Sequence, residues 1–128
     1  MTIYIIEDDD LYAEFIKRSL AQIGDYKITV FSSAESCLEA LMDGPLPDAF
    51  ITDYQLPGKT GIEIYDDIKS RLKPENKFIM ISALDDGNLV LSFIKKGVRD
   101  YVTKDDTVID SLKAILEGNE DEYYLFKE

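Results

Sequence analysis

Asp53 is the residue whose type and position most clearly suggest chemistry in this chain. The stretch before it, Ala49–Thr52, is typical of a buried strand, and the stretch after it, Tyr54–Gly58, is typical of a turn. Asp53 is therefore predicted at the carboxyl end of a strand, where open α/β sheets bind their ligands. A lone aspartate in that place is also explained as a turn-capping residue, so its neighbours must decide between the two roles.

Further polar residues stand at the ends of other apolar stretches. They are Glu7, Asp8, Ser82 and Lys104. In a parallel sheet the carboxyl ends of all strands lie at one edge, so these side chains and Asp53 are expected to meet there.

Carboxylates that meet in this way repel one another and raise each other's pKa unless a cation neutralises them. Mg²⁺ suits such a cluster because it prefers oxygen ligands and keeps several waters. An aspartate can also accept a phosphoryl group covalently, and Lys104 could pair with Asp53 at rest and with a phosphoryl oxygen afterwards. The simpler alternatives are that residues 7–10 only favour a helix N-terminus, a role we expect for Asp9 and Asp10, and that Lys104 is a surface lysine.

Strand-like and helix-like segments alternate along the chain. The predicted strands are Thr2–Ile6, Lys27–Phe31, Ala49–Thr52, Phe78–Ser82 and Asp100–Val102. Five helices are predicted from apolar stripes, namely Leu11, Phe15, Ile16 and Leu20; Cys37, Leu38, Leu41 and Met42; Ile62, Tyr65, Ile68 and Leu72; Leu89, Val90, Phe93 and Ile94; and Val108, Ile109, Leu112, Ile115 and Leu116. Ser32 and Glu35 predict a capping box for the second helix. Gly24, Gly44, Gly97 and Gly118 stand where helix C-caps are expected. Strict alternation predicts an α/β fold with a doubly wound parallel sheet and helices on both faces.

Composition excludes several function classes. The 128 residues are enough for one domain, and a net charge of −12 argues against direct binding of nucleic acid. The chain contains no histidine, so histidine triads, histidine metal sites and a phosphohistidine on this chain are excluded. No apolar run approaches the length of a membrane span and no secretory signal pattern opens the sequence. Together with a single cysteine, Cys37, these features predict a cytoplasmic protein.

The acid pair Glu7 and Asp8, the lone Asp53, the hydroxyl of Ser82 and Lys104, each at a strand end and in that order, resemble the receiver domain of bacterial response regulators. The resemblance covers roughly residues 1–118 and implies the flavodoxin-like strand order 2-1-3-4-5, for which the chemotaxis receiver is a standard example.

The resemblance also implies a role for each site residue. Asp53 would be the phosphoacceptor, and Lys104 and Ser82 would contact the phosphoryl oxygens. Mg²⁺ would be bound by Asp8, Asp53 and the backbone carbonyl of Gln55, with Glu7 acting through water. Tyr101 matches the aromatic residue that moves inward when the switch hydroxyl is recruited.

The implied function is a phosphorylation switch in two-component signalling rather than an enzyme. A partner histidine kinase, a phosphotransfer protein or a small phosphodonor would supply the phosphoryl group. The altered surface, made by the fourth helix, fifth strand and fifth helix, would be presented to a downstream protein or a second copy of the chain. Lys95, Lys96 and Arg99 give that face local positive charge for ion pairs across such an interface.

One position departs from the family pattern, and three alternatives compete with the switch. Asp105 stands where the family usually has proline, so a trans Lys104–Asp105 bond is expected, because a cis bond to a non-proline residue costs about 2.5–4 kcal/mol.

A degenerate receiver that binds partners without phosphorylation is one alternative, although the site residues are intact. A haloacid-dehalogenase-type phosphohydrolase would need an acid where Gln55 stands, and a flavodoxin would need a Ser/Thr/Gly-rich phosphate loop after the first strand.

Residues 119–128 fall outside the alternating pattern and are expected to form an acidic, aromatic tail beyond the receiver domain. Four large apolar residues in a row, Tyr123–Phe126, are unusual for a solvated tail. We expect them to contact a surface, but the sequence leaves open whether that surface belongs to the domain itself or to a partner.

Overall fold

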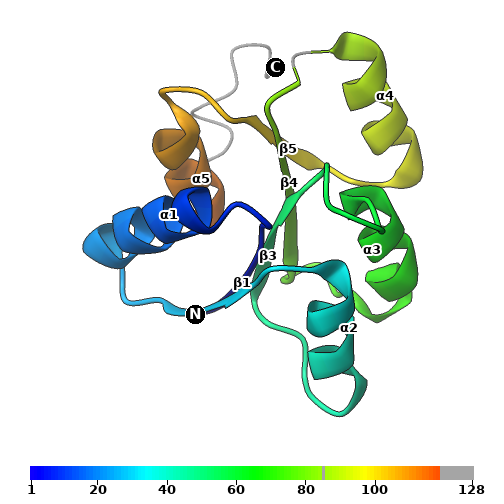
Figure 1. Cartoon of the computed structure of the whole chain (residues 1–128), viewed down its shortest axis with the longest axis horizontal. Coiled ribbons are helices and arrows are strands. Elements are labelled where there is room, and N and C mark those ends of the chain that lie inside the picture. The colour runs from blue at the N-terminus through cyan, green and yellow to red at the C-terminus, as the bar shows by residue number, and fades with distance from the viewer. Residues whose placement is uncertain (85, 119–128) are drawn as a thin grey trace.

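The computed structural model describes residues 1–84 and 86–118 of the chain. Five strands form one parallel sheet in the order β2-β1-β3-β4-β5, which confirms the predicted topology (Figure 1). The strands are β1 (Thr2–Ile6), β2 (Lys27–Phe31), β3 (Ala49–Asp53), β4 (Lys77–Ser82) and β5 (Asp100–Thr103). The helices are α1 (Asp10–Ile23), α2 (Ala34–Met42), α3 (Gly61–Ile68) with the 3₁₀ turn η1 (Lys69–Arg71), α4 (Gly87–Lys96) and α5 (Val108–Leu116).

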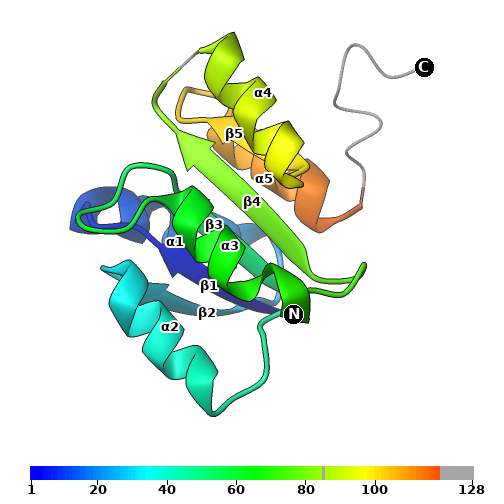
Figure 2. The ribbon, with the colours of Figure 1, turned by 90° about the vertical axis from the view of Figure 1, so that its right-hand side faces the viewer.

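Helices cover both faces of the sheet. The helices α1 and α5 lie on one face, and α2, α3 and α4 lie on the other (Figures 1 and 2). Side chains alternate along each strand, so Ile51 of β3 packs in the core under α1 and α5 while its neighbour Phe50 packs in the core under the other three helices. All of β3 is buried, as the continuous apolar sequence of a strand covered on both faces predicts.

The helix ends follow local side-chain chemistry, with one correction to the sequence prediction. The helix α2 is capped by Ser33 and not by Ser32, because the Ser33 hydroxyl accepts the amide of Ser36. The capping box lies instead at α3, where Thr60 and Glu63 exchange side-chain and backbone hydrogen bonds. Two adjacent serines offer the same hydroxyl, so the sequence alone does not select the residue that caps α2.

The glycines expected at helix ends do not all act alike. Gly97 ends α4 with φ of +108°, in the left-handed region that favours glycine, and Gly118 after α5 has φ of +77°. Gly24 follows α1 in extended backbone with φ of −166°, which any residue adopts. Gly44 lies one residue beyond Asp43, which is the C-cap of α2.

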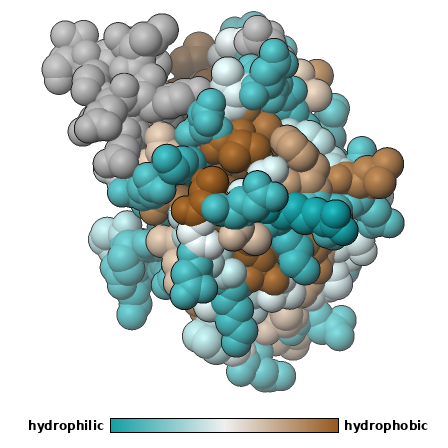
Figure 3. Space-filling model, turned by 90° about the vertical axis from the view of Figure 1, so that its left-hand side faces the viewer, coloured by the Kyte–Doolittle hydropathy of each residue, from teal (hydrophilic) through white to brown (hydrophobic). Residues whose placement is uncertain are grey.

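Some residues of the predicted apolar stripes do not enter the core. Leu11 is 84% exposed, and Phe15, Met42 and Ile94 are also exposed. Figure 3 views the side of the molecule that carries α1 and α5, and apolar surface lies among hydrophilic residues there. The apolar stripes of α1, α2 and α4 are therefore wider than the faces that these helices bury against the sheet.

The predicted tail of residues 119–128 lies outside the described residues, and the boundary at residue 118 stays a prediction. Among the described residues no helix is long and apolar enough to cross a membrane.

Candidate functional site

Three carboxylates meet at the carboxyl edge of the sheet. Asp53 is the last residue of β3, and Glu7 and Asp8 directly follow β1, which is hydrogen-bonded to β3 along its length. One carboxylate oxygen from each residue lies within 4.8 Å of the others. Glu7 and Asp53 are buried and Asp8 is exposed, so the cluster opens to solvent on the Asp8 side. The structure thus brings together the acids that the strand-end pattern predicts.

Lys104 places its ammonium between the two buried acids. Its Nζ donates to Glu7 Oε1 at 2.7 Å and to Asp53 Oδ2 at 3.1 Å. The Lys104 side chain is only 16% exposed, so solvent screens these ion pairs weakly. Its backbone amide donates to the carbonyl of Ser82 at 2.8 Å, which fixes the residue beside the end of β4. Lys104 is therefore not the surface lysine of the simpler alternative.

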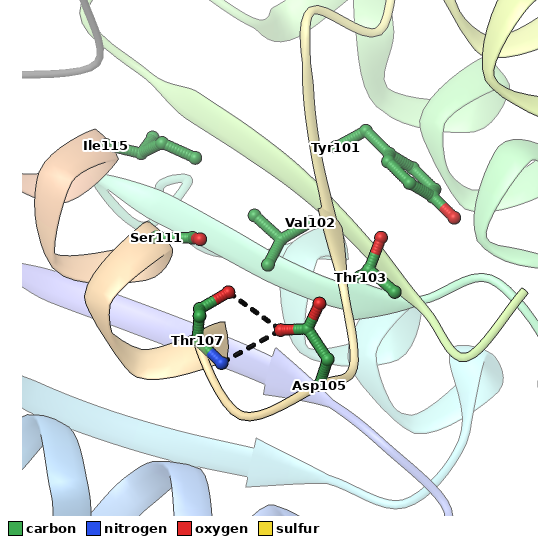
Figure 4. A pocket seen from close by; sticks show the side chains of 7 residues that line it. All are labelled: Tyr101, Val102, Thr103, Asp105, Thr107, Ser111 and Ile115. Carbon is green, nitrogen blue, oxygen red and sulfur yellow. Dashed lines mark hydrogen bonds between the residues drawn. The ribbon is translucent and has the colours of Figure 1, made fainter. Parts of the chain in front are cut away.

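The turn after Lys104 is built by Asp105. Its carboxylate accepts the amide and the hydroxyl of Thr107 at 2.9 and 2.8 Å, as Figure 4 shows. The described residues contain no cis peptide bond, so the Lys104–Asp105 bond is trans, as expected. The aspartate thus builds by hydrogen bonding the turn in which the family usually has proline.

A separate cavity of about 180 Å³ lies beside this turn, between β5 and α5. Its lining residues are Tyr101, Val102, Thr103, Asp105, Thr107, Ser111 and Ile115. None of the three clustered carboxylates lines it, so it is distinct from the acidic site.

Burial and the neighbouring charges shift the pKa values of Glu7 and Lys104. Burial raises the pKa of Glu7 to about 7, with Asp53 adding to the rise and the hydrogen bond from Lys104 opposing it. Burial also disfavours the charged form of Lys104, but hydrogen bonds to Glu7 and Asp53 outweigh it and the pKa of Lys104 is raised. Lys104 thus keeps its charge, but its hydrogen bond does not offset the effect of burial on the pKa of Glu7.

The loop after Asp53 is held against the sheet. The Gln55 amide donates to Asp53 Oδ1 at 3.3 Å, and the Tyr54 amide donates to the carbonyl of Ile81 at 2.9 Å. Gly61 begins α3 so close to the strand that a Cβ there would lie 2.8 Å from the Asp53 carbonyl oxygen. Both Asp53 oxygens are therefore oriented, while the role of the Gln55 carbonyl as a metal ligand stays a prediction.

Ser82 and Tyr101 are connected through the backbone of Leu84. The buried Ser82 hydroxyl accepts the Leu84 amide at 3.0 Å, and the half-buried Tyr101 hydroxyl donates to the Leu84 carbonyl. The Tyr101 ring also lies 5.5 Å from the ring of Phe93 in α4. The sequence analysis named the Ser82 hydroxyl and the Tyr101 ring but missed Leu84, because nothing in an exposed leucine signals that its backbone is hydrogen-bonded to both residues.

Comparison with known proteins then identifies the family. Residues 3–117 match the response regulator receiver domain. The chain belongs to this family. Receiver domains are signalling switches of two-component response regulators, and the fold and the acidic edge described above agree with this membership.

The receiver domain matches relatives of similar length and relatives that are about twice as long. It is 29% identical to the chemotaxis protein CheY of Listeria monocytogenes over 85% of this chain and 93% of that protein. It is 28% identical to the transcriptional regulatory protein DegU of Brevibacillus brevis over 91% of this chain but 50% of that protein. The chain thus spans about half the length of several curated relatives that it matches.

Solved structures agree with the fold. The response regulator TrrA of Thermotoga maritima, solved in complex with Mg(2+)-BeF, is 26% identical and superposes with a TM-score of 0.77 over 92% of this chain and 97% of that one. The Francisella response regulator 1452 receiver domain has a TM-score of 0.79 at 24% identity, over 96% and 98% of the two chains, and its likeness concerns the fold alone.

Receiver domains bind Mg²⁺ at an acidic pocket, and the donor set of this chain fits that ion. The three clustered residues offer only carboxylate oxygens, which are the ligands Mg²⁺ prefers. Burial, with a smaller contribution from Asp53, raises the pKa of Glu7, and a divalent cation beside it would favour the ionised carboxylate.

Proposed function

We propose that this receiver domain is a Mg²⁺-dependent phosphorylation switch with Asp53 as its phosphoacceptor. The observation that carries the proposal is the environment of Asp53. This residue is buried at a strand end, and one of its carboxylate oxygens accepts a hydrogen bond from the Lys104 ammonium while the other accepts one from the Gln55 amide. A nucleophile held in this way has its oxygens aimed before the donor arrives, and such positioning supplies much of the rate of phosphoryl transfer.

The transfer itself needs few groups. A carboxylate oxygen of Asp53 forms a bond to phosphorus while the bond from phosphorus to the donor's histidine nitrogen, or to the leaving group of a small phosphodonor, breaks. The leaving group takes the electron pair, and Asp53 becomes an acyl phosphate. Lys104 stays beside the phosphoryl oxygens as a fixed counter-charge. Asp8, Asp53 and the Gln55 carbonyl would hold Mg²⁺, with Glu7 acting through water, and the bound ion would add charge neutralisation at those oxygens.

The switch would then act through Ser82 and Tyr101. In its hydrogen bond with Leu84 the Ser82 oxygen is the acceptor, so that bond does not use the hydroxyl proton. Recruitment of this hydroxyl by a phosphoryl oxygen would disturb the Leu84 backbone, to which Tyr101 is also bonded. Phosphorylation can shift the equilibrium between two forms only through such differential contacts.

We propose the surface of α4, β5 and α5 as the surface that changes, and a downstream protein or a second copy of the chain as its partner. Leu91 and Ile94 of α4 are 55% and 58% exposed, which gives this face apolar contact area. Lys95 is exposed, whereas Lys96 lies 3.7 Å from Asp66 of α3 and is partly engaged within the domain. The proposed location is the cytoplasm, where the single buried Cys37 needs no disulfide partner.

Intact mass after incubation with Mg²⁺ and acetyl phosphate tests the phosphoacceptor. Wild type should gain one phosphoryl group, and chelation by EDTA or the Asp53→Asn substitution should abolish the gain. Asp25→Asn, which changes an exposed aspartate in the α1–β2 loop, is the matched control and should be phosphorylated normally. Phosphate retained by Asp53→Asn would refute the assignment. A wild type that takes no phosphoryl group from any donor would favour the alternative, a receiver that binds partners without phosphorylation.

The proposed surface is tested by chemical shifts. Addition of beryllofluoride and Mg²⁺ should shift backbone amide signals across residues 88–117. Unchanged signals there, with changes confined to the acidic site, would refute the switch mechanism while leaving Asp53 as the phosphoacceptor.

A further inference from the structure

Tyr12 lies beside the acidic site, and neither the sequence pattern nor the proposed switch gives it a role. It belongs to the first turn of α1, where its amide donates to the carboxylate of Asp9, the N-cap of the helix, at 3.1 Å. Its side chain is half-buried and packs against the core cluster under α1 and α5. The helix start therefore fixes Tyr12 near the edge of the sheet where the carboxylates meet.

The ring of Tyr12 faces the ammonium of Lys104. The distance from Lys104 Nζ to the ring centroid is 4.6 Å, within the roughly 6 Å over which a ring face attracts a cation. Glu7 and Asp53 hold the same ammonium through hydrogen bonds, so the ring provides a third contact. The attraction grows as water is excluded, and the Lys104 side chain is only 16% exposed.

The contact of Tyr12 with Lys104 is made by its ring and not by its hydroxyl. The Tyr12 hydroxyl is buried and has no hydrogen-bond partner among the described residues. Burial raises the pKa of Tyr12 and outweighs the opposing effect of Lys104, so the phenol stays neutral at neutral pH. What Lys104 meets is therefore the negative face of an aromatic ring and not a phenolate.

We propose that Tyr12 is a positioning residue whose ring face holds the Lys104 ammonium between Glu7 and Asp53. A lysine side chain is long and flexible, and each further contact with its ammonium reduces its freedom to turn toward solvent. The Tyr12 ring covers one side of the Lys104 ammonium, so this positive charge is in place before the phosphoryl group arrives. The contribution to phosphoryl transfer rests on the proposed function, whereas the contact between ring and ammonium does not.

Nuclear magnetic resonance of the unphosphorylated full chain tests the contact directly. A ring that faces the ammonium shifts the Lys104 Hε proton signals upfield by its ring current. The upfield shift should be present in wild type and in Tyr12→Phe, which keeps the ring and removes only the unpartnered hydroxyl. It should be lost in Tyr12→Leu. The matched control is Phe15→Leu, which removes the neighbouring ring of α1, 5.8 Å from Tyr12, and should leave the Lys104 signals in place.

Phosphorylation kinetics with acetyl phosphate and Mg²⁺ test the positioning role. Tyr12→Leu should slow the initial rate about three- to tenfold, the range that a partly desolvated cation–ring contact supports. Tyr12→Phe and Phe15→Leu should stay near the wild-type rate. Recovery of the rate by phenylalanine, but not by leucine, separates the ring face from mere filling of space. If Tyr12→Leu does not fold, Tyr12→Met takes its place as the variant without a ring.

Three results would overturn the inference. They are Lys104 Hε signals that do not move when the ring is removed, a Tyr12→Leu variant that is phosphorylated at the wild-type rate, and a Tyr12→Phe variant as slow as Tyr12→Leu. A wild type that takes no phosphoryl group would instead refute the proposed function, and the proton shifts would still decide whether the ring holds the lysine.

Discussion

Replacing Glu7 with glutamine should remove a pH dependence of stability from the metal-free protein. Glu7 is 1% exposed, and burial raises its pKa from 4.5 to about 7. Glutamine has nearly the shape of the neutral acid and never ionises, so Glu7→Gln mimics the form that the folded site favours without metal. We expect the variant to be more stable than wild type at alkaline pH and close to it at acidic pH.

The sign of this pH dependence follows from whether the folded or the unfolded chain binds the Glu7 proton more tightly. The folded pKa lies above the unfolded one, so the folded state holds the proton on Glu7 more tightly than the unfolded chain does. This contribution to stability is fully present below about pH 4.5 and is lost as the pH rises through about 7. Each pKa unit corresponds to about 1.4 kcal/mol. Between about pH 5 and about pH 8 wild type should therefore lose about 1–3 kcal/mol through this group, since the exposed Asp8 lets some water into the cluster.

Urea unfolding of both proteins in EDTA, across that pH range, measures the difference. The relevant quantity is the free energy of unfolding of Glu7→Gln minus that of wild type, which should grow with pH. Glu39→Gln removes one exposed acid from α2 and controls for the change in net charge of this acidic protein. It should show no such growth.

Two outcomes would refute the reasoning. A difference that stays constant with pH would mean that Glu7 titrates alike in the folded and unfolded chains. A difference that shrinks with rising pH would mean that ionised Glu7 stabilises the fold, and hence that the Lys104 ion pair outweighs the cost of burial.

Three further predictions concern the metal and two helix caps. Mg²⁺ should stabilise wild type at about pH 8, by about 2.7 kcal/mol at a hundredfold excess over its dissociation constant, and Asp8→Asn should lose most of this gain in thermal unfolding. Gly97→Ala should lower the unfolding free energy by more than about 1 kcal/mol, because φ is +108° and the new Cβ would lie 2.7 Å from the Tyr65 hydroxyl oxygen. Asp9→Ala should cost about 0.5–2 kcal/mol in urea unfolding, because two α1 amides lose their acceptor.

The strands were predictable because burial on both faces leaves a strong pattern. The stretch Ala49–Thr52 is wholly apolar apart from its threonine, and the structure extends that strand by one residue to Asp53. The strand order was not predictable from alternation alone, since right-handed crossovers allow more than one order. It came from the resemblance of the strand-end residues to a known family, and the structure confirms it.

The sequence predicted which residues of the candidate site meet, because strand topology decides this, but not the contacts that their side chains make. Parallel strands bring Glu7, Asp53 and Lys104 to one edge whatever their side chains do, and the structure places them there. Which acid Lys104 contacts more closely depends on side-chain geometry that no spacing rule encodes. Tyr12 was missed because its position in the sequence suggests only helix packing. It lies, however, in the first turn of a helix that begins just after the acid pair, and this topology does place it near the site.

The charge balance of the site links its carboxylates and Lys104 to the proposed binding of a cation and a phosphoryl group. Among the described residues three carboxylates cluster at the site, and the ammonium of Lys104 pairs with two of them, so the fully ionised site carries excess negative charge. A phosphoryl group adds further negative charge, and transfer to Asp53 would then bring like charges together. A second lysine there would remove one unit of this excess charge and so weaken the attraction of the site for a divalent cation. In the proposed switch a bound cation would offset part of this excess, so cation binding and phosphorylation would favour each other.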